Sequence, residues 1–231
     1  MEKKKTTADL FARFLISQQD FGFLFEVLSQ VISIARKENE KLGTGFLRGQ
    51  NFNQFFVKYF MNSFAGDFRK RCLFPFIQKV AFFDKLEEGD AKNSKAKEKR
   101  DAMISVLVDH LFSQIERVAK EHGVPKEFTM LMSLLQEDEY SAVVFLRFLS
   151  PALSNPKTFG VTGKQLSIAH NSNLVLLSKI IQRIANGKLV TAEESLPADF
   201  INANIKHKTL DRIYAILLAK PLFKTECQTQ K

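Results

Sequence analysis

Aromatic residues recur with the period of a helix in the first third of this chain. After Asn51 they follow at i, i+3, i+4, i+7 and i+8, as Phe52, Phe55, Phe56, Tyr59 and Phe60. This spacing places the rings on one face of an amphipathic helix, with Asn51 as its cap. Alternating patterns typical of strands are nearly absent, and only 10 glycines and 6 prolines interrupt 231 residues. The sequence therefore predicts an all-α fold.

The same periodicity predicts further helices along the chain. A first helix is expected from Ala8 with Thr7 as its cap, and a later one is expected to stop at Gly187. Loops are expected where glycine, proline or charge accumulates, and 87–100 is expected to be a mobile surface connection. The expected helices span about 8–15, 21–36, 52–60, 67–83, 101–121, 126–136, 139–149, 167–186 and 209–219, and the expected loops span 37–45, 87–100, 150–164 and 191–197.

Phenylalanine dominates the aromatic residues, with 23 Phe and no Trp. Because a phenyl ring carries no polar group, the core should be apolar and heavily aromatic. The net charge of +9 favours acidic partners, which include nucleic acid, anionic membranes and acidic protein surfaces. The two cysteines cannot form a disulfide framework, and neither cysteine nor histidine spacing indicates a metal site. The composition is typical of a cytosolic protein, with no signal peptide or membrane span expected.

The motifs of enzymes that act alone are missing from the sequence. Segment 160–165 has the glycines and lysine of a phosphate-binding loop, but its spacing is short and Gln165 replaces the Ser or Thr that would meet Mg²⁺. No nucleophile elbow or carboxylate pair indicates hydrolysis. The basic tract 92–100 has the charge to bind nucleic acid or anionic lipid, but it lacks interleaved aromatic residues, so a solvated loop is favoured.

Two arginines stand in contrasting surroundings. The first lies in Phe46-Leu47-Arg48-Gly49, among glycines, and the second lies in Phe145-Leu146-Arg147-Phe148, inside an apolar run. Glycines give the backbone the freedom to approach a partner closely, so Arg48 is a candidate to be held out from the fold. The alternative is an ordinary exposed arginine.

Arg147 needs partners because its charge cannot be left desolvated in an apolar run. Its planar fork suits the backbone carbonyls of a neighbouring loop, which it would brace. The alternative is a pairing with Glu137 or Asp138 near the helix end. If Arg48 is presented to a partner and Arg147 braces the loop that carries it, the pair suggests a protein that inserts a cation into the active site of another protein.

A polar strip is expected on the helix at 167–186. At 100° per residue, Lys179, Gln182 and Asn186 line one side of this helix, opposite a face formed by leucines and isoleucines. The strip has the character to contact an acidic partner, and the alternative is a solvated helix face.

Taken together, these stretches resemble the catalytic domain of Ras GTPase-activating proteins. Segment 145–156, FLRFLSPALSNP, resembles the signature run of that family, and 177–186, LSKIIQRIAN, resembles the version found in neurofibromin. Segment 46–49 resembles the finger loop, where the family usually has Leu-Phe-Arg-Gly, and 66–80 resembles the helix that follows. The resemblance implies an all-α RasGAP-type domain over 1–231, with its core at about 8–190 and a C-terminal helical extension at about 191–231.

The resemblance also implies a role for individual residues. Arg48 would be the arginine finger inserted into the nucleotide site of Ras, and Arg147 would stabilise the finger loop and help position the catalytic glutamine of Ras. Lys179, Gln182 and Asn186 would lie in the groove that receives the switch regions of Ras. The further partner-binding residues would be Leu47, Gly49 and Leu146, and the residues with a structural role would be Pro151 and Asn155.

The implied partner is a Ras-family small GTPase in its GTP form, and no nucleic acid is expected. The domain would need no cofactor or metal of its own, since GTP and Mg²⁺ belong to the GTPase. It would be a monomeric, cytoplasmic regulator rather than an enzyme, recruited to the membranes where the GTPase resides. The alternatives are a scaffold of the same fold that binds GTPases without activating them, and a basic lipid or nucleic-acid binder.

The sequence also departs from the family pattern. Gln50-Asn51 stands where the family commonly has Asn-Ser after Arg-Gly. The interval between the two arginines is shorter than in the best-known members, and the flanking helical lobe of larger members is reduced. These departures bear on affinity and on the choice of GTPase.

Overall fold

A computed structural model describes residues 2–18, 20–43, 46–47, 51–83, 86, 94–191 and 196–219. Every regular element within these ranges is helical, which confirms the all-α prediction. No helix among the described residues is long and apolar enough to cross a membrane. The elements are α1 (Glu2–Ser17), α2 (Phe21–Leu42), α3 (Phe52–Val80), α4 (Ser94–His122), α5 (Lys126–Ser133), a 3₁₀ turn η1 (Glu137–Glu139), a π-helix η2 (Ala142–Leu149), α6 (Ser150–Ser154), α7 (Ile168–Ala185), α8 (Ala198–Lys206) and α9 (Asp211–Leu218).

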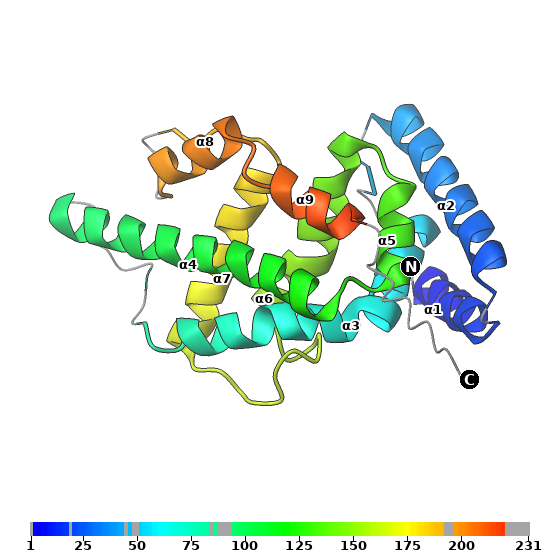
Figure 1. The fold of residues 1–231 in the computed structure, drawn as a ribbon, viewed down its shortest axis with the longest axis horizontal. Helices are drawn as coiled ribbons and strands as arrows, with labels where there is room; N and C mark the ends of the chain where they lie inside the picture. The colour runs from blue at the N-terminus through cyan, green and yellow to red at the C-terminus, as the bar shows by residue number, and fades with distance from the viewer. Residues whose placement is uncertain are drawn as a thin grey trace, which may run out of the picture.

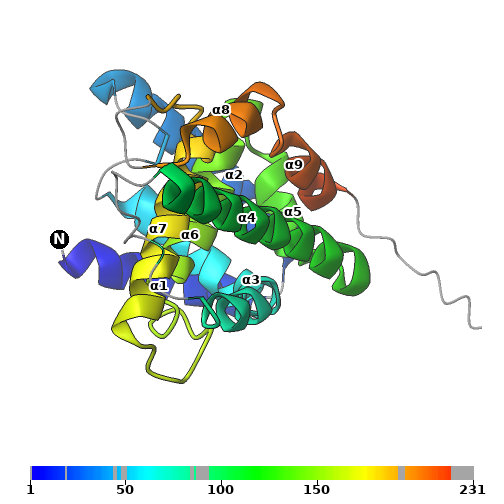
Figure 2. The same cartoon turned by 90° about the vertical axis from the view of Figure 1, so that its left-hand side faces the viewer.

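The two longest helices, α3 and α4, pack along each other and form the length of the molecule. In Figure 1, α7 crosses steeply behind α4, while α1 and α2 lie together at one end. Both views place α8 and α9 along the upper side of α4, and α9 also packs on α5 (Figures 1 and 2). Helices η2 and α6 pack on α7 in the interior. This arrangement buries η2, which carries Arg147, between α3 and α7.

Helix α3 is continuous, whereas the sequence analysis predicted separate helices at 52–60 and 67–83. Its aromatic stripe explains the continuity, because a side chain faces the core at every fourth position. Neighbouring rings are stacked or tilted, with centroids 6.3 Å apart for Phe56–Phe60 and 4.8 Å apart for Phe60–Phe64. The stripe runs on through positions 68, 72 and 76 and consists of Phe56, Phe60, Phe64, Phe68, Cys72 and Phe76.

Several predicted helix ends were wrong. Helix α1 begins at Glu2, so Thr7 lies inside it and its hydroxyl donates to the Lys3 carbonyl instead of capping the helix. Asp20 caps α2, which continues to Leu42 and ends at Gly43 with a φ of +58°. The expected loop at 37–45 therefore begins six residues later.

The remaining differences concern segments that were predicted as loops. Helix α4 begins at Ser94, so 94–100 is helical, while 87–93 lies outside the described residues. Residues 150–154 form α6, and α8 occupies a stretch for which no helix was predicted. Short helices of this kind are stabilised mainly by tertiary packing, so periodicity alone gives them little signal.

Arg69 in α3 is buried, with an exposed fraction of 3%. Its guanidinium lies over the rings of Phe148 and Phe159, 5.1 Å and 5.0 Å from their centroids. It donates to Asn62 Oδ1 and to the Phe159 carbonyl. Burial lowers the pKa of Arg69 to about 10. This arginine therefore ties the segment that follows α6 to the middle of α3.

Candidate partner-binding site

Arg147 is placed by an unusual helical segment. Residues 142–149 form a π-helix, in which the Ser150 N–H donates to the carbonyl of Phe145, five residues back. Such wider turns are rare and often occur at functional sites. Phe145 and Phe148 are fully buried, whereas Arg147 is only half-buried. The packing of the two rings thus fixes the turn from which Arg147 projects.

The guanidinium of Arg147 holds the loop that precedes Arg48. Its Nε and Nη2 atoms donate to the Leu47 carbonyl at 3.2 Å and 2.9 Å. The bonded carbonyl is the one directly before residue 48, although the two partners are 100 residues apart in the chain. Of the two predicted arrangements for Arg147, the geometry is that of a bond to the carbonyl of a neighbouring loop.

Leu47 adopts a backbone conformation that is costly for a leucine. Its φ is +53°, in the left-handed region where residues other than glycine are uncommon. Its side chain is buried, as is that of Phe46. Apolar burial and two charge-assisted hydrogen bonds offset the strain, and strained residues of this kind cluster at functional sites. Arg48 and Gly49, which the sequence analysis singled out, lie outside the described residues.

The helices on either side of this loop are joined by a carboxylate. Glu38 near the end of α2 accepts hydrogen bonds from Asn51 Nδ2 at 2.7 Å and from Asn53 Nδ2 at 3.0 Å. Asn51 also caps α3, as predicted, by accepting from the Gln54 N–H at 2.9 Å. The departure from the family pattern at position 51 therefore supplies both a cap and a bond across the base of the loop.

An ion pair fixes α2 to η1. Arg36 donates from Nε and Nη2 to the two carboxylate oxygens of Glu139 at 2.8 Å and 2.6 Å, and from Nη2 to the Leu134 carbonyl. Glu139 also accepts from the Gln136 N–H. The hydrogen bond to Glu139 raises the pKa of Arg36, with burial acting in the opposite direction. The carboxylate paired with an arginine near the helix end is thus Glu139, and its partner is Arg36.

On α7, Gln182 is held by a buried hydroxyl. Ser178 donates to the Ser150 carbonyl at 3.1 Å, accepts from Ser154 Oγ at 3.0 Å, and accepts from Gln182 Nε2 at 3.2 Å. The network joins α7 to the start of α6, directly after the π-helix. It therefore fixes the distance between the two elements that carry Arg147 and the predicted polar strip.

Only part of the predicted polar strip on α7 lies near the start of the loop at Phe46 and Leu47. Lys179 and Asn186 are exposed and Gln182 is half-buried. A polar cavity of about 390 Å³ is lined by Phe46, Leu146 and Asn186, together with the Arg36–Glu139 pair. The structure thus gathers the start of the loop, the residue before Arg147 and the end of α7 around one hollow, whereas Lys179 lies two turns back along α7 and does not line it.

The two residues predicted to be structural lie at either end of α6. Pro151 occupies the first turn, where its missing N–H is least costly. Asn155 ends the helix, and its Oδ1 accepts from the hydroxyl of Thr158 at 2.8 Å. In this arrangement Pro151 and Asn155 delimit the short helix that follows the π-helix.

The residues that the sequence analysis missed are those that fix the helices around the site. Arg36, Glu38, Glu139 and Ser178 sit in helical patterns that look like ordinary polar positions, and only the tertiary contacts distinguish them. Within the described ranges, no group of three or more His, Cys, Asp or Glu residues is placed to hold a metal ion.

Two comparisons with known proteins bear on this site. The family model for the GTPase-activator protein for Ras-like GTPase matches residues 138–186. The chain is also 28% identical over 170 residues to the Ras GTPase-activating protein gap-2 of Caenorhabditis elegans, a match that covers 65% of this chain and 14% of that protein. This chain therefore matches only about a seventh of the length of that relative.

Both matches support a RasGAP-type domain in this chain. The matched segment begins in η1, contains η2 and α6, and ends just after α7. It thus includes Arg147, Gln182 and Asn186 and does not include position 48.

Proposed function

We propose that this domain stimulates GTP hydrolysis by a Ras-family small GTPase, and that Arg48 is the arginine inserted into the nucleotide site of the partner. One observation carries the proposal: the guanidinium of Arg147 is bonded to the Leu47 carbonyl, the residue directly before Arg48. A cation delivered to another protein needs its backbone held in place, and this contact supplies the hold.

The chemistry of GTP hydrolysis explains why an arginine suits this role. In the transition state, negative charge spreads over the γ-phosphoryl oxygens and the leaving bridge oxygen. A cation positioned there stabilises the transition state more than the ground state. Arginine keeps its charge at all physiological pH values, and its fork spans two oxygens, which lysine cannot do. In the Ras and Gα systems such an arginine contributes about 10³–10⁵ in kcat.

The surrounding residues would orient this loop and receive the partner. Arg147 holds Leu47, and the Glu38 and Arg36 contacts fix the helices on both sides. Leu47, Gly49 and Leu146 would touch the GTPase, and Lys179, Gln182 and Asn186 would line the groove for its switch regions. The domain would act as a monomer in the cytoplasm, on the GTP form, at membranes where the GTPase resides, and GTP and Mg²⁺ would come with the partner.

The test is single-turnover phosphate release from Ras·GTP with the wild-type domain, Arg48→Ala and Arg48→Lys. We expect acceleration by the wild type and a loss of about 10³-fold in both variants, with binding to the GTP form largely kept. Arg13→Ala is the matched control, because Arg13 is an exposed arginine on α1 whose ion-pair partner among the described residues is Asp9 of the same helix.

Two outcomes would contradict the proposal. Unchanged acceleration by Arg48→Ala would exclude this arginine as the inserted cation. Tight binding to the GTP forms of Ras and its relatives, without acceleration of any of them, would favour the scaffold alternative.

A further inference from the structure

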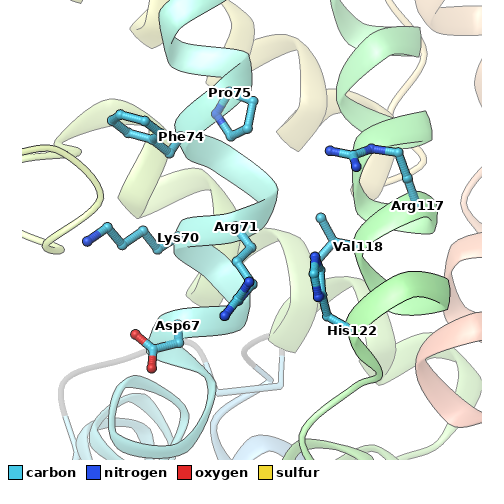
Figure 3. Close-up of a pocket in the computed structure, with 8 residues that line it drawn as sticks. All are labelled: Asp67, Lys70, Arg71, Phe74, Pro75, Arg117, Val118 and His122. Atoms are coloured by element: carbon cyan, nitrogen blue, oxygen red, sulfur yellow. The ribbon is translucent and has the colours of Figure 1, made fainter.

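A hollow of about 470 Å³ lies between α3 and α4, outside the candidate partner-binding site. In Figure 3, Arg71 from α3 and His122 from α4 lie in the space between the two helices, and Arg117 reaches from α4 toward α3. Lys70 and Phe74 project from α3 in the same direction, away from α4 in this view (Figure 3). The hollow therefore has a floor where two helices meet and a lining rich in cations.

The charge of this lining is not balanced. The residues that line it include three permanent cations, Lys70, Arg71 and Arg117, and one carboxylate, Asp67. The guanidinium of Arg117 is divided between Glu121 at 2.7 Å and Gln114 Oε1 at 3.1–3.3 Å. No hydrogen bond or ion pair is recorded for the side chains of Lys70 and Arg71 within the described ranges, so both are available to an anion.

One cation of the hollow, Arg117, also acts on the nearby His110. Burial lowers the pKa of His110, and the cations Lys79 and Arg117 lower it further. His122 lies in the last turn of α4. Two helices thus present cationic and donor side chains to one hollow.

The residues beside the cations indicate what carries the anion. The ring of Phe74 is 37% exposed, and Pro75 follows it on the same edge of the hollow. Exposed aromatic and apolar groups next to lysine and arginine are typical of surfaces that lie in the headgroup region of a bilayer. An anion in solution would contact only the cations. A lipid headgroup at a membrane surface would contact the cations and the apolar edge.

We propose that this hollow, which we call the α3–α4 hollow, binds the phosphate-bearing headgroup of an anionic lipid. Arg71, Arg117 and His122 would donate to the phosphate, and Lys70 and Phe74 would lie against the membrane surface. The described part of the basic tract, 94–100, does not line the hollow. No residue of the hollow belongs to the candidate partner-binding site. The proposal stands whether or not the domain activates a GTPase.

The test is sedimentation of the domain with phosphatidylcholine vesicles that contain or lack phosphatidylserine. We expect binding only to the anionic vesicles. The double variant Lys70→Gln/Arg71→Gln should lose affinity by about fivefold for each cation removed. The matched control is Lys164→Gln/Lys206→Gln, which removes the same charge from two exposed lysines away from the hollow and should bind like the wild type apart from a small uniform loss.

Three outcomes would overturn the proposal. Equal losses in both double variants would mean that net charge, and not the hollow, attracts the membrane. Failure of the wild type to bind anionic vesicles would exclude the lipid, and so would binding of a soluble phosphopeptide at the hollow without vesicle binding. Unfolding midpoints of all variants establish that each is folded, and phosphate release from Ras·GTP in solution, expected to be unchanged in Lys70→Gln/Arg71→Gln, tests the proposed function separately.

Discussion

At the scale of single residues, the carbonyl of the buried Leu47 accepts hydrogen bonds from Arg147, a side chain 100 residues away in the chain. Leu47 has a positive φ, so this loop stays in its shape only while the surrounding contacts hold it. The charge of Arg147 thus acts through the backbone of the loop that carries Arg48.

Arg147→Ala should lower the rate of GTP hydrolysis at saturating domain by about a hundredfold, because misplacing a catalytic group by about 1 Å costs that much. The dissociation constant for the GTP-bound GTPase should change much less, since Arg147 is bonded within the domain. Single-turnover rates over a concentration series separate the two quantities. A raised dissociation constant with an unchanged saturating rate would mean that Arg147 serves binding alone.

At the scale of elements, α2 is fixed to η1 and to α3 by carboxylates. Of the two carboxylates, Glu38 and Glu139, we expect Glu139 to contribute more to stability. Its side chain is only 5% exposed, and it accepts hydrogen bonds from Arg36 and from the Gln136 N–H. Removing one member of such a pair leaves the other charge poorly compensated. The position of the loop at the end of α2 therefore depends on this pair.

Glu139→Ala should lower the free energy of unfolding by about 2 kcal/mol, less than for a fully buried pair because Arg36 remains about a third exposed. Urea unfolding monitored by circular dichroism gives the value. Asp9→Ala is the control: it removes the exposed Asp9–Arg13 pair of α1, which is worth at most about 1 kcal/mol. Equal losses in the two variants would show that the Arg36–Glu139 pair has no special weight.

At the scale of the whole molecule, the net charge of +9 should act on the encounter with a partner. Electrostatic attraction between complementary surfaces speeds association and is screened by salt. The association rate constant with a GTP-bound GTPase should therefore fall steeply as salt increases, while the dissociation rate constant changes little. Stopped-flow measurements at several salt concentrations distinguish the two. A salt effect confined to dissociation would mean that the charges act only within the formed complex.

The helical class could be predicted from the chain because its signal is local. Aromatic rings recur at every third or fourth position, and glycine and proline are few. An α-helix is the regular structure that places such rings on one face, where they are buried together. The cap at Asn51 and the positions of η2 and α7 follow from the same local rules. The ends of α1, α2 and α4 could not be predicted from these rules, because polar helical turns are stabilised by tertiary packing rather than by their own hydrophobic pattern.

The sequence predicted the kind of surroundings that each arginine needs. A charge in an apolar run must be paired, and a glycine-rich segment has the backbone freedom to approach a partner protein. The identity of the partners was decided only by the tertiary structure. At the helix end Glu139 is paired with Arg36, whereas Arg147 donates to the Leu47 carbonyl. A local pattern specifies that a charge must be satisfied, but only the packing of helices distant in sequence determines which atoms come within hydrogen-bonding distance.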